Sequence, residues 1–313
     1  MRVVEEPFPE RISAGSVVAI GKFDGVHAGH RAVIGGAVER AAALGLESVV
    51  LTFDRNPYEV VRPATASRRI FDLPARLALI ERTGVDLAVV LRFDHERAEQ
   101  SAQDFARVEL AGRLAARAVY VGEDFFFGRR GHGDVPLLRS LGAELGFEVV
   151  ALPLVPGDGQ AKVSSTRIRE RILAGEVRIA AELLGAPVTV GGVVVHGEAR
   201  GRELGFPTAN LRLGEFDIVP ADGVYAGWAV VDGVRHPAAI SVSDNPTFGD
   251  VAERRVEAFL LDAALDLYGR RLTIEFVDRV RGIERFESVD ALIGAMRDDV
   301  TRTRAILGLP AAG

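Results

Sequence analysis

The chain has 313 residues, no cysteine and a formal net charge of -6 at pH 7. Its length exceeds the usual size of one domain and predicts two domains with separate cores. The acidic balance argues against a nucleic-acid partner bound through its phosphates, and it favours chemistry on small molecules. The start of the chain has no signal-like pattern, and no run approaches the roughly 18 apolar residues that span a bilayer. We expect a soluble cytoplasmic protein with no disulfide bond and no membrane partner.

Apolar runs alternate with amphipathic stretches through the first half of the chain. The runs rich in Val and Leu predict strands at Ser16–Ile20, Ser48–Phe53, Leu87–Phe93, Ala118–Gly122 and Glu148–Pro153. The stretches between them predict helices at Arg31–Leu44, Leu73–Thr83, Ala102–Leu114 and Pro136–Leu145. This alternation predicts a doubly wound parallel α/β sheet, whose ligands bind beyond the carboxyl ends of the strands.

A glycine-rich run, GKFDGVHAGH at residues 21–30, joins the first strand to the first helix. Its helix N-terminus and its two imidazoles, His27 and His30, can all donate to an anion, so we interpret it as a nucleotide phosphate site. The spacing matches neither a P-loop nor a dinucleotide fingerprint. Two alternatives remain open from the run alone: a metal pair with Asp24 as a third ligand, and a purely structural turn.

A second polar segment, SSTR at residues 164–167, precedes a helix expected at Arg167–Ala174. Its hydroxyls suit a plain N-cap. Arg167 and Arg169 place two guanidinium groups beside the same helix N-terminus, a combination that suits a triphosphate. The local pattern supports both interpretations about equally.

The second half of the chain has short β-branched runs separated by Gly, Asp and Pro. Strands are expected at Val188–Val195, Val224–Val231, Ala238–Val242, Arg255–Leu261 and Leu272–Val280. Their regular spacing predicts a closed antiparallel β-barrel, followed by a terminal helix at Val289–Leu307. The change of pattern puts the domain boundary between residues 185 and 186, which gives an N-terminal domain of 1–185 and a C-terminal domain of 186–313.

Residues 201–210, GRELGFPTAN, have the character of a loop, because Gly205 and Pro207 both interrupt regular structure. Thr208 and Asn210 are two residues apart and would face one side of an extended segment. Their oxygens can complete the shell of a Mg²⁺ that also holds phosphates, although an Asx or ST turn explains the same residues. Glu257 is a lone carboxylate in a strand-like run, a place where such residues are usually solvated.

Five motifs in order resemble those of the bifunctional prokaryotic riboflavin kinase/FMN adenylyltransferase family, or FAD synthetase. They are the two runs above at 21–30 and 201–210, LTFDRNP at 51–57, VGEDFFFG at 121–128 and VSSTRIR at 163–169. The resemblance covers nearly the whole chain. It implies a C-terminal kinase that makes FMN from riboflavin and ATP with Mg²⁺, and an N-terminal nucleotidyltransferase that makes FAD from FMN and a second ATP.

The resemblance also implies residue roles. Glu257 would be the base toward the 5′-hydroxyl of riboflavin, with Thr208 and Asn210 helping to hold Mg²⁺. The groups that stabilise charge during adenylylation would be His27, His30 and Arg167. The expected ATP-binding residues are Gly21, Phe23, Asp24, Gly29, Ser165, Thr166, Gly201, Arg202, Gly205 and Pro207. The expected flavin-binding residues are Asn56, Asp124, Phe125 and Phe127.

The chain departs from the family at Ser243-Asp244, where members commonly carry Gly-Thr before an Asn-Pro-Thr-Phe segment. Losing the glycine removes easy access to a positive φ, and the aspartate adds a negative charge near an expected phosphate or flavin pocket. Two alternatives follow: an FMN adenylyltransferase with a kinase-impaired, flavin-binding barrel, or a non-catalytic flavin or nucleotide sensor. A homo-oligomer is left open.

Overall fold

The computed structural model describes residues 1–153, 163–197, 204–245, 253–263 and 265–311. The chain divides into two compact units. Unit 1 comprises Met1–Arg69 and Leu73–Ser165, and unit 2 comprises Ile70–Asp72 and Thr166–Gly313. The functional boundary expected between residues 185 and 186 stays a prediction.

Unit 1 is built on a six-stranded sheet with the order β1-β4-β3-β2-β5-β6. All neighbouring strands are parallel, as predicted. The strands are β1 (Arg2–Glu5), β2 (Ser16–Ile20), β3 (Glu47–Phe53), β4 (Leu87–Leu91), β5 (Ala116–Gly122) and β6 (Glu148–Leu152). Every residue of β2 and β4 is buried, which explains their unbroken apolar sequences. Strand β1 was not predicted, because it is short and largely exposed at the sheet edge.

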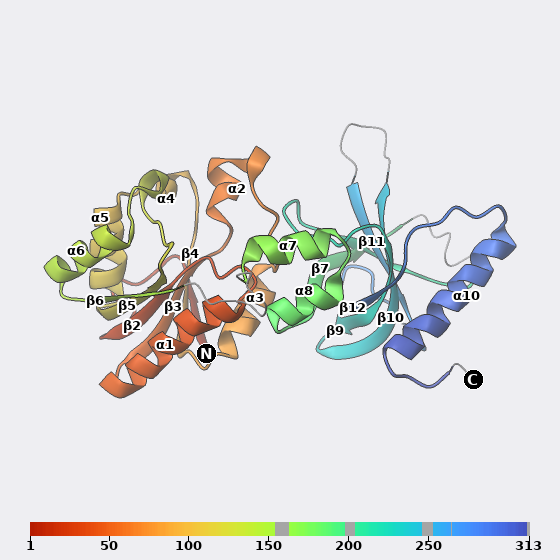
Figure 1. The fold of residues 1–313 in the computed structure, drawn as a ribbon, viewed down its shortest axis with the longest axis horizontal. Coiled ribbons are helices and arrows are strands. Elements are labelled where there is room, and N and C mark those ends of the chain that lie inside the picture. Colours follow the sequence, from red (N-terminus) through yellow and green to blue (C-terminus); the bar gives the residue numbers. More distant parts are fainter. Residues whose placement is uncertain (154–162, 198–203, 246–252, 264, 312–313) are drawn as a thin grey trace. The chain divides into compact units, whose positions relative to one another are not determined.

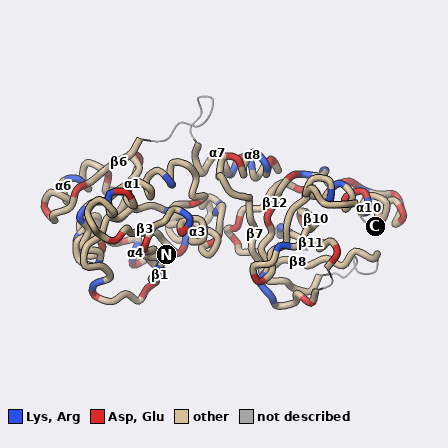
Figure 2. Tube along the Cα trace, turned by 90° about the horizontal axis from the view of Figure 1, so that it is seen from below, with Lys and Arg blue, Asp and Glu red and all other residues tan. Residues whose placement is uncertain are grey.

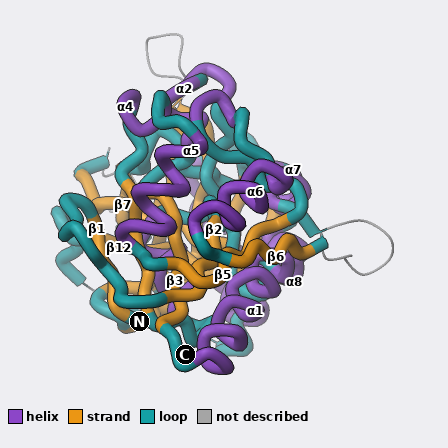
Figure 3. The backbone as a smooth tube through the Cα atoms, turned by 90° about the vertical axis from the view of Figure 1, so that its left-hand side faces the viewer, coloured by secondary structure: helices purple, strands orange, loops and turns teal. Residues whose placement is uncertain are grey.

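Helices cover both faces of this sheet. Figure 3 shows α1 (Ala28–Leu44) on one side, and α5 (Ala102–Phe105) and α6 (Val135–Leu145) on the other. Each face has its own apolar cluster, one around Ile34 and the other around Leu138. The shorter elements of the unit are α2 (Pro57–Val61), α3 (Leu73–Glu81), α4 (His95–Ala98) and the 3₁₀ turns at Pro63–Thr65 and Arg129–Gly131.

The stretch Ala102–Leu114 is not the single α-helix that we expected. After α5, residues Ala106–Arg113 form a π-helix. Its widened turn is marked by the bond from Leu114 N to the carbonyl of Glu109, at 3.0 Å. Periodicity near 3.6 residues does not distinguish the two helix types over so short a span.

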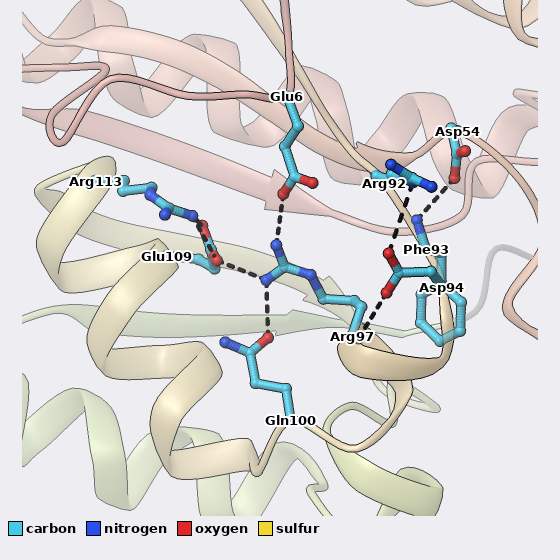
Figure 4. Close-up of polar contacts among 9 residues, drawn as sticks. All are labelled: Glu6, Asp54, Arg92, Phe93, Asp94, Arg97, Gln100, Glu109 and Arg113. Atoms are coloured by element: carbon cyan, nitrogen blue, oxygen red, sulfur yellow. Dashed lines mark hydrogen bonds and ion pairs between the residues drawn. The ribbon is translucent and has the colours of Figure 1, made fainter.

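A buried ion network fixes the π-helix to its neighbours (Figure 4). The carboxylate of Glu109, which is almost fully buried, accepts from Arg97 at 2.6 Å and from Arg113 at 2.9 Å. Arg97 also donates to Glu6 at 2.5 Å and to Gln100 at 2.9 Å. The network therefore joins the segment after β1, helix α4 and the π-helix.

Unit 2 contains a closed antiparallel barrel with the order β10-β11-β8-β7-β12-β9, which confirms the predicted fold. Its strands are β7 (Val188–Val195), β8 (Ala209–Arg212), β9 (Gly223–Val231), β10 (Val234–Asn245), β11 (Glu253–Leu260) and β12 (Arg271–Arg281). Helix α10 (Val289–Ile306) lies against the barrel (Figure 1). Arg281 holds it there through two bonds to Asp299, at 2.8 and 2.7 Å.

Three local expectations for unit 2 need correction. Strand β8 includes Ala209 and Asn210, which we had assigned to the loop at 201–210, because β8 pairs with both β7 and β11. Strand β10 is longer than predicted at both ends. Helix α8 (Val177–Leu184), which follows α7 (Ser165–Leu173), was missed although it is amphipathic.

Within the part of the chain that the structure describes, no helix has both the length and the apolar character needed to cross a bilayer. Basic and acidic residues are interspersed along the traces of both units (Figure 2).

Glu109→Gln removes the charge at the centre of the network while keeping the shape of the side chain. We expect the free energy of unfolding of unit 1 to fall by about 3 kcal/mol, because two arginines then lose a buried partner. Chemical denaturation monitored by circular dichroism measures this change. The matched control is Glu148→Gln, whose carboxylate pairs with Arg40 on the surface and should contribute below about 1 kcal/mol. Equal effects of the two substitutions would contradict the prediction.

Candidate functional site

The turn at residues 21–27 joins β2 to α1 in an unusual backbone conformation. Phe23 and Val26 have φ values of 47° and 41°, in the region that disfavours side chains, and Gly25 has a φ of 96°. Both side chains are buried almost completely. Burial of Phe23 and Val26 therefore holds a strained turn at the carboxyl edge of the sheet.

The two histidines of this turn lie together at the N-terminus of α1. The rings of His27 and His30 are stacked, with centroids 3.8 Å apart, and Phe23 meets His30 edge-on at 5.5 Å. A Cβ at Gly29 would lie 3.3 Å from the ring of His27, and one at Gly21 would lie 3.0 Å from the ring of Phe23. The glycines thus permit the ring packing, and the helix N-terminus adds backbone donors for an anion.

The loop after β3 carries Asp54 and Asn56. Asp54 accepts from Phe93 N and from Arg55 Nε, each at 2.9 Å. Asn56 is the N-cap of α2, accepting from Tyr58 N at 3.2 Å, and it forms a capping box with Glu59. Burial raises the pKa of the Glu59 carboxyl. Asn56 has this structural role whether or not it binds flavin, and its flavin contact stays a prediction.

The loop after β5 contains three consecutive phenylalanines with different surroundings. Phe127 is 7% exposed and packs on Phe105 at 5.9 Å, and Phe125 stacks on Phe127 at 5.5 Å. Phe126, which we did not single out, is 66% exposed. The turn before them is tight, because a Cβ at Gly122 would lie 2.9 Å from Asp124 Oδ1. The structure therefore makes Phe127 a core residue, and the flavin roles of Asp124, Phe125 and Phe127 stay predictions.

Ser165, the last residue of unit 1, bonds to the histidine turn. The Ser165 hydroxyl donates to the carbonyl of Asp24 at 2.7 Å. Thr166 and Arg167 follow in the first turn of α7, among the residues grouped with unit 2. Ser165 therefore has a structural bond in addition to the nucleotide contact that we expected.

Sequence reasoning missed Arg76, which lies on α3 and is buried beside the histidine turn. Its guanidinium donates to the carbonyl of Lys22 at 3.0 Å. An arginine in an amphipathic helix is normally assigned to the exposed face. The available signal was its helical phase, because Arg76 is four residues before the buried Ile80 and so lies on the same face.

A second group of predicted residues meets on the outer face of the barrel. In β11, Val256, Ala258 and Leu260 are buried, so the residues between them, including Glu257, face outward. Glu257 lies directly opposite Asn210 of β8. The Thr208 hydroxyl donates to Glu257 Oε2 at 3.2 Å.

The surroundings of this group are also close-packed. A Cβ at Gly197 would lie within 2.7 Å of the side-chain amide of Asn210. The backbone at Gly197 therefore packs directly against that amide. Arg255 lies 3.6 Å from Glu257 Oε1. Gly205 has a φ of 86°, which requires glycine there. Pro207 is exposed, and Gly201 and Arg202 lie outside the described residues.

The hydroxyl oxygen of Thr208 and the amide oxygen of Asn210 are hard donors of the kind that fits Mg²⁺, and Glu257 lies beside both. Among the described residues there is no group of three or more His, Cys, Asp or Glu side chains that could hold a metal by itself. Phosphate oxygens would therefore have to supply the remaining ligands.

The departure at Ser243-Asp244 is accommodated locally. Both residues belong to β10, opposite Arg255 and Arg254, and neither has a positive φ. Asp244 pairs with Arg254 at 2.8 Å, and Arg254 also binds Asp222 at 2.5 Å. Neither position has the positive φ for which we expected glycine to matter. Arg254 is shared by Asp222 and Asp244, so it offsets only part of the added charge.

Two family models match the chain, FAD synthetase over residues 10–167 and riboflavin kinase over residues 184–307. The bifunctional riboflavin kinase/FMN adenylyltransferase of Pseudomonas fluorescens is 39% identical over 298 residues, which is 93% of each chain. The protein of the same name from Escherichia coli K12 is 35% identical over 94% of each chain. A crystal structure described as a macrolide-efflux protein from Streptococcus pneumoniae is 33% identical, with a TM-score of 0.83 over 97% of this chain and 99% of that one.

The different surroundings of Phe126 and Phe127 give a test of the loop after β5. Phe127→Ala should lower the free energy of unfolding by about 3 kcal/mol, because it leaves a cavity in the apolar core. Phe126→Ala, at the neighbouring exposed position, is the matched control and should change it by less than about 0.5 kcal/mol. Urea denaturation of the two variants measures both changes. A larger effect at Phe126 would mean that the loop is packed differently.

Proposed function

The chain belongs to the bifunctional riboflavin kinase/FMN adenylyltransferase family, and from this premise we propose which of its residues act in each of the two reactions. It phosphorylates riboflavin with ATP to give FMN, and it adenylylates FMN with a second ATP to give FAD and pyrophosphate. The observation that carries this conclusion is that both family models match one chain.

The two activities divide at residues 185 and 186. Adenylylation belongs to residues 1–185 and the kinase to residues 186–313. The ends of the two family matches support this division, because one stops at residue 167 and the other starts at residue 184. Ser165 at the start of α7 supports assigning that helix to the adenylylation site, since it bonds the histidine turn.

In the kinase reaction, the 5′-hydroxyl oxygen of riboflavin attacks the γ-phosphorus of ATP, and ADP leaves. Glu257 accepts the proton of that hydroxyl. Thr208 and Asn210 would hold Mg²⁺, which when bound neutralises charge on the phosphates. The bond from Thr208 keeps the Glu257 carboxylate aimed at the outer face of the barrel. Gly205 and Pro207, with Gly201 and Arg202 of the same motif, would bind ATP.

In the adenylylation reaction, a phosphate oxygen of FMN attacks the α-phosphorus of ATP, and the bond to pyrophosphate breaks. His27, His30 and Arg167 stabilise the charge that grows on the leaving group, so no covalent enzyme intermediate is needed. The close packing of the imidazoles supports this role, because it fixes their donors before the substrate arrives.

The remaining predicted residues surround these groups. Gly21, Phe23, Asp24 and Gly29 lie in or next to the turn between β2 and α1, and Ser165 and Thr166 begin α7. Asn56, Asp124, Phe125 and Phe127 lie in loops that follow β3 and β5, at the carboxyl edge where such sheets bind ligands. That position supports a flavin site at this edge.

We place the protein in the cytoplasm, because both reactions consume ATP. Its partners are then the small-molecule substrates, without nucleic acid or membrane. The net charge of -6 and the interspersed basic and acidic residues support this view (Figure 2).

Product analysis by chromatography tests both activities in one design. With ATP and Mg²⁺, the wild-type protein should convert riboflavin to FMN and FAD, and FMN to FAD. Glu257→Gln should slow FMN formation by about 10²-fold or more, because the base is lost, while FAD formation from FMN is unchanged.

Other outcomes of that design distinguish the alternatives. FAD from FMN alone in the wild type would indicate an adenylyltransferase with an impaired barrel. Binding of ATP and flavin without any turnover would indicate a sensor. Equal losses of both activities in Glu257→Gln would contradict the assignment of Glu257 to the kinase.

Gly29→Ala should slow adenylylation without destabilising the protein. The new methyl group would press on the ring of His27 from 3.3 Å, while alanine favours the helix by up to about 1 kcal/mol. Gly35→Ala, in the same helix with nothing within 4 Å of the new Cβ, is the matched control and should keep full activity. Steady-state kinetics and thermal denaturation measure the two effects, and an unchanged rate in Gly29→Ala would show that the ring position does not limit the reaction.

A further inference from the structure

Arg76 occupies an unusual position for an arginine. It lies in the first turn of α3, and its side chain is buried, with 5% of the residue exposed. A guanidinium in such a place loses most of its hydration, which costs several kcal/mol unless other groups compensate. Burial lowers the pKa of Arg76, and the charge of Asp24 opposes that change. A buried cation kept at this cost needs an explanation beyond filling space.

Two backbone carbonyls supply part of the compensation, and they come from the two motifs that bound the site. Arg76 Nη1 donates to the carbonyl of Lys22 in the histidine turn. Arg76 Nη2 donates to the carbonyl of Phe53 at the end of β3, just before Asp54. One planar guanidinium thus spans the exits of β2 and β3.

The same junction carries further bonds between the two strands. The Thr52 hydroxyl donates to the carbonyl of Lys22 at 3.3 Å, and Gly21 N donates to the carbonyl of Leu51 at 3.2 Å. These bonds reach only the start of the histidine turn. Arg76 adds a positive charge to the junction, where the charges of Asp24, Asp54 and Glu59 raise its pKa and that of Arg69 lowers it.

One donor of the Arg76 guanidinium makes no hydrogen bond to the described residues. Arg76 Nε is buried and has no hydrogen-bond partner among the described residues. An arginine that served only to fasten helix α3 would be expected to satisfy every donor, because a buried unpaired N–H costs about 1 to 3 kcal/mol. Both bonds that the Arg76 guanidinium makes go to the loops that follow β2 and β3.

We propose that Arg76 is a positioning residue for adenylylation: it ties the loop that carries His27 and His30 to the loop that carries Asp54 and Asn56. This inference rests on the proposed function of unit 1. The nucleotide donors lie on one loop and a candidate flavin contact on the other, so their spacing sets the approach of the FMN phosphate to ATP. A small error in such spacing costs about 10²-fold in rate.

The test compares the full-length protein with its Arg76→Met and Arg76→Lys variants. Methionine removes the charge and both hydrogen bonds. Lysine keeps the charge but cannot bond both carbonyls with one planar group. We expect Arg76→Met to lower kcat for FAD formation from FMN by at least about tenfold and to raise the KM for ATP in that reaction. Arg76→Lys should recover part of the loss. The riboflavin kinase activity of the same preparations should keep its kcat and its KM for ATP.

Assays are run below the melting temperature of each variant, as measured by circular dichroism. Partial unfolding alone would lower the apparent kcat and leave the KM for ATP unchanged, and that result would overturn the proposal. Full adenylylation activity in Arg76→Met, or equal losses in both activities of Arg76→Lys, would overturn it too.

Arg107→Met, at an exposed arginine of unit 1, is the matched control. Absence of FAD formation in the wild type would instead reject the proposed function.

Discussion

The turn between β2 and α1 is the constraint on which the site of unit 1 depends. The chain must leave a fully buried strand and start a helix within seven residues, and it does so with two side chains at positive φ. Such conformations cost on the order of 1 to 3 kcal/mol each, and burial of Phe23 and Val26 offsets that cost. Because the turn cannot relax without exposing those side chains, the histidines that follow it keep one position at the helix N-terminus.

In unit 2 the corresponding constraint is the register of the barrel. Alternate residues of β11 fill the interior, and the residues between them face outward. Since the period is two, a shift by one residue would turn Glu257 into the apolar interior and bring a core residue out. Closure of the barrel forbids that shift, because β11 is paired on one side with β8 and on the other with β10. The opposition of Glu257 and Asn210 is therefore a consequence of the fold.

Much of this architecture was predictable because it depends on repeating patterns. Continuous apolar runs predicted the parallel strands, and short β-branched runs predicted the barrel. The missed features depend on contacts between distant segments. The π-helix forms where Glu109 meets Arg97, the inward orientation of Phe127 depends on Phe105, and Arg76 is buried because two carbonyls lie above it. The predicted site residues Thr208, Asn210 and Glu257 do come together, although only the family motif linked them in the sequence.

The effect of the departure from the family motif at Ser243-Asp244 depends on the side chains that these two residues contact. An aspartate beside a phosphate site opposes binding only if its charge is uncompensated. Arg254 offsets part of this charge from the facing strand, and it also binds Asp222 and the carbonyl of Pro220. Asp244 therefore joins an existing cation instead of adding an isolated charge. The backbone there is regular strand, for which glycine offers no advantage. The regular strand and the shared arginine therefore weaken both arguments for an impaired kinase at these two residues.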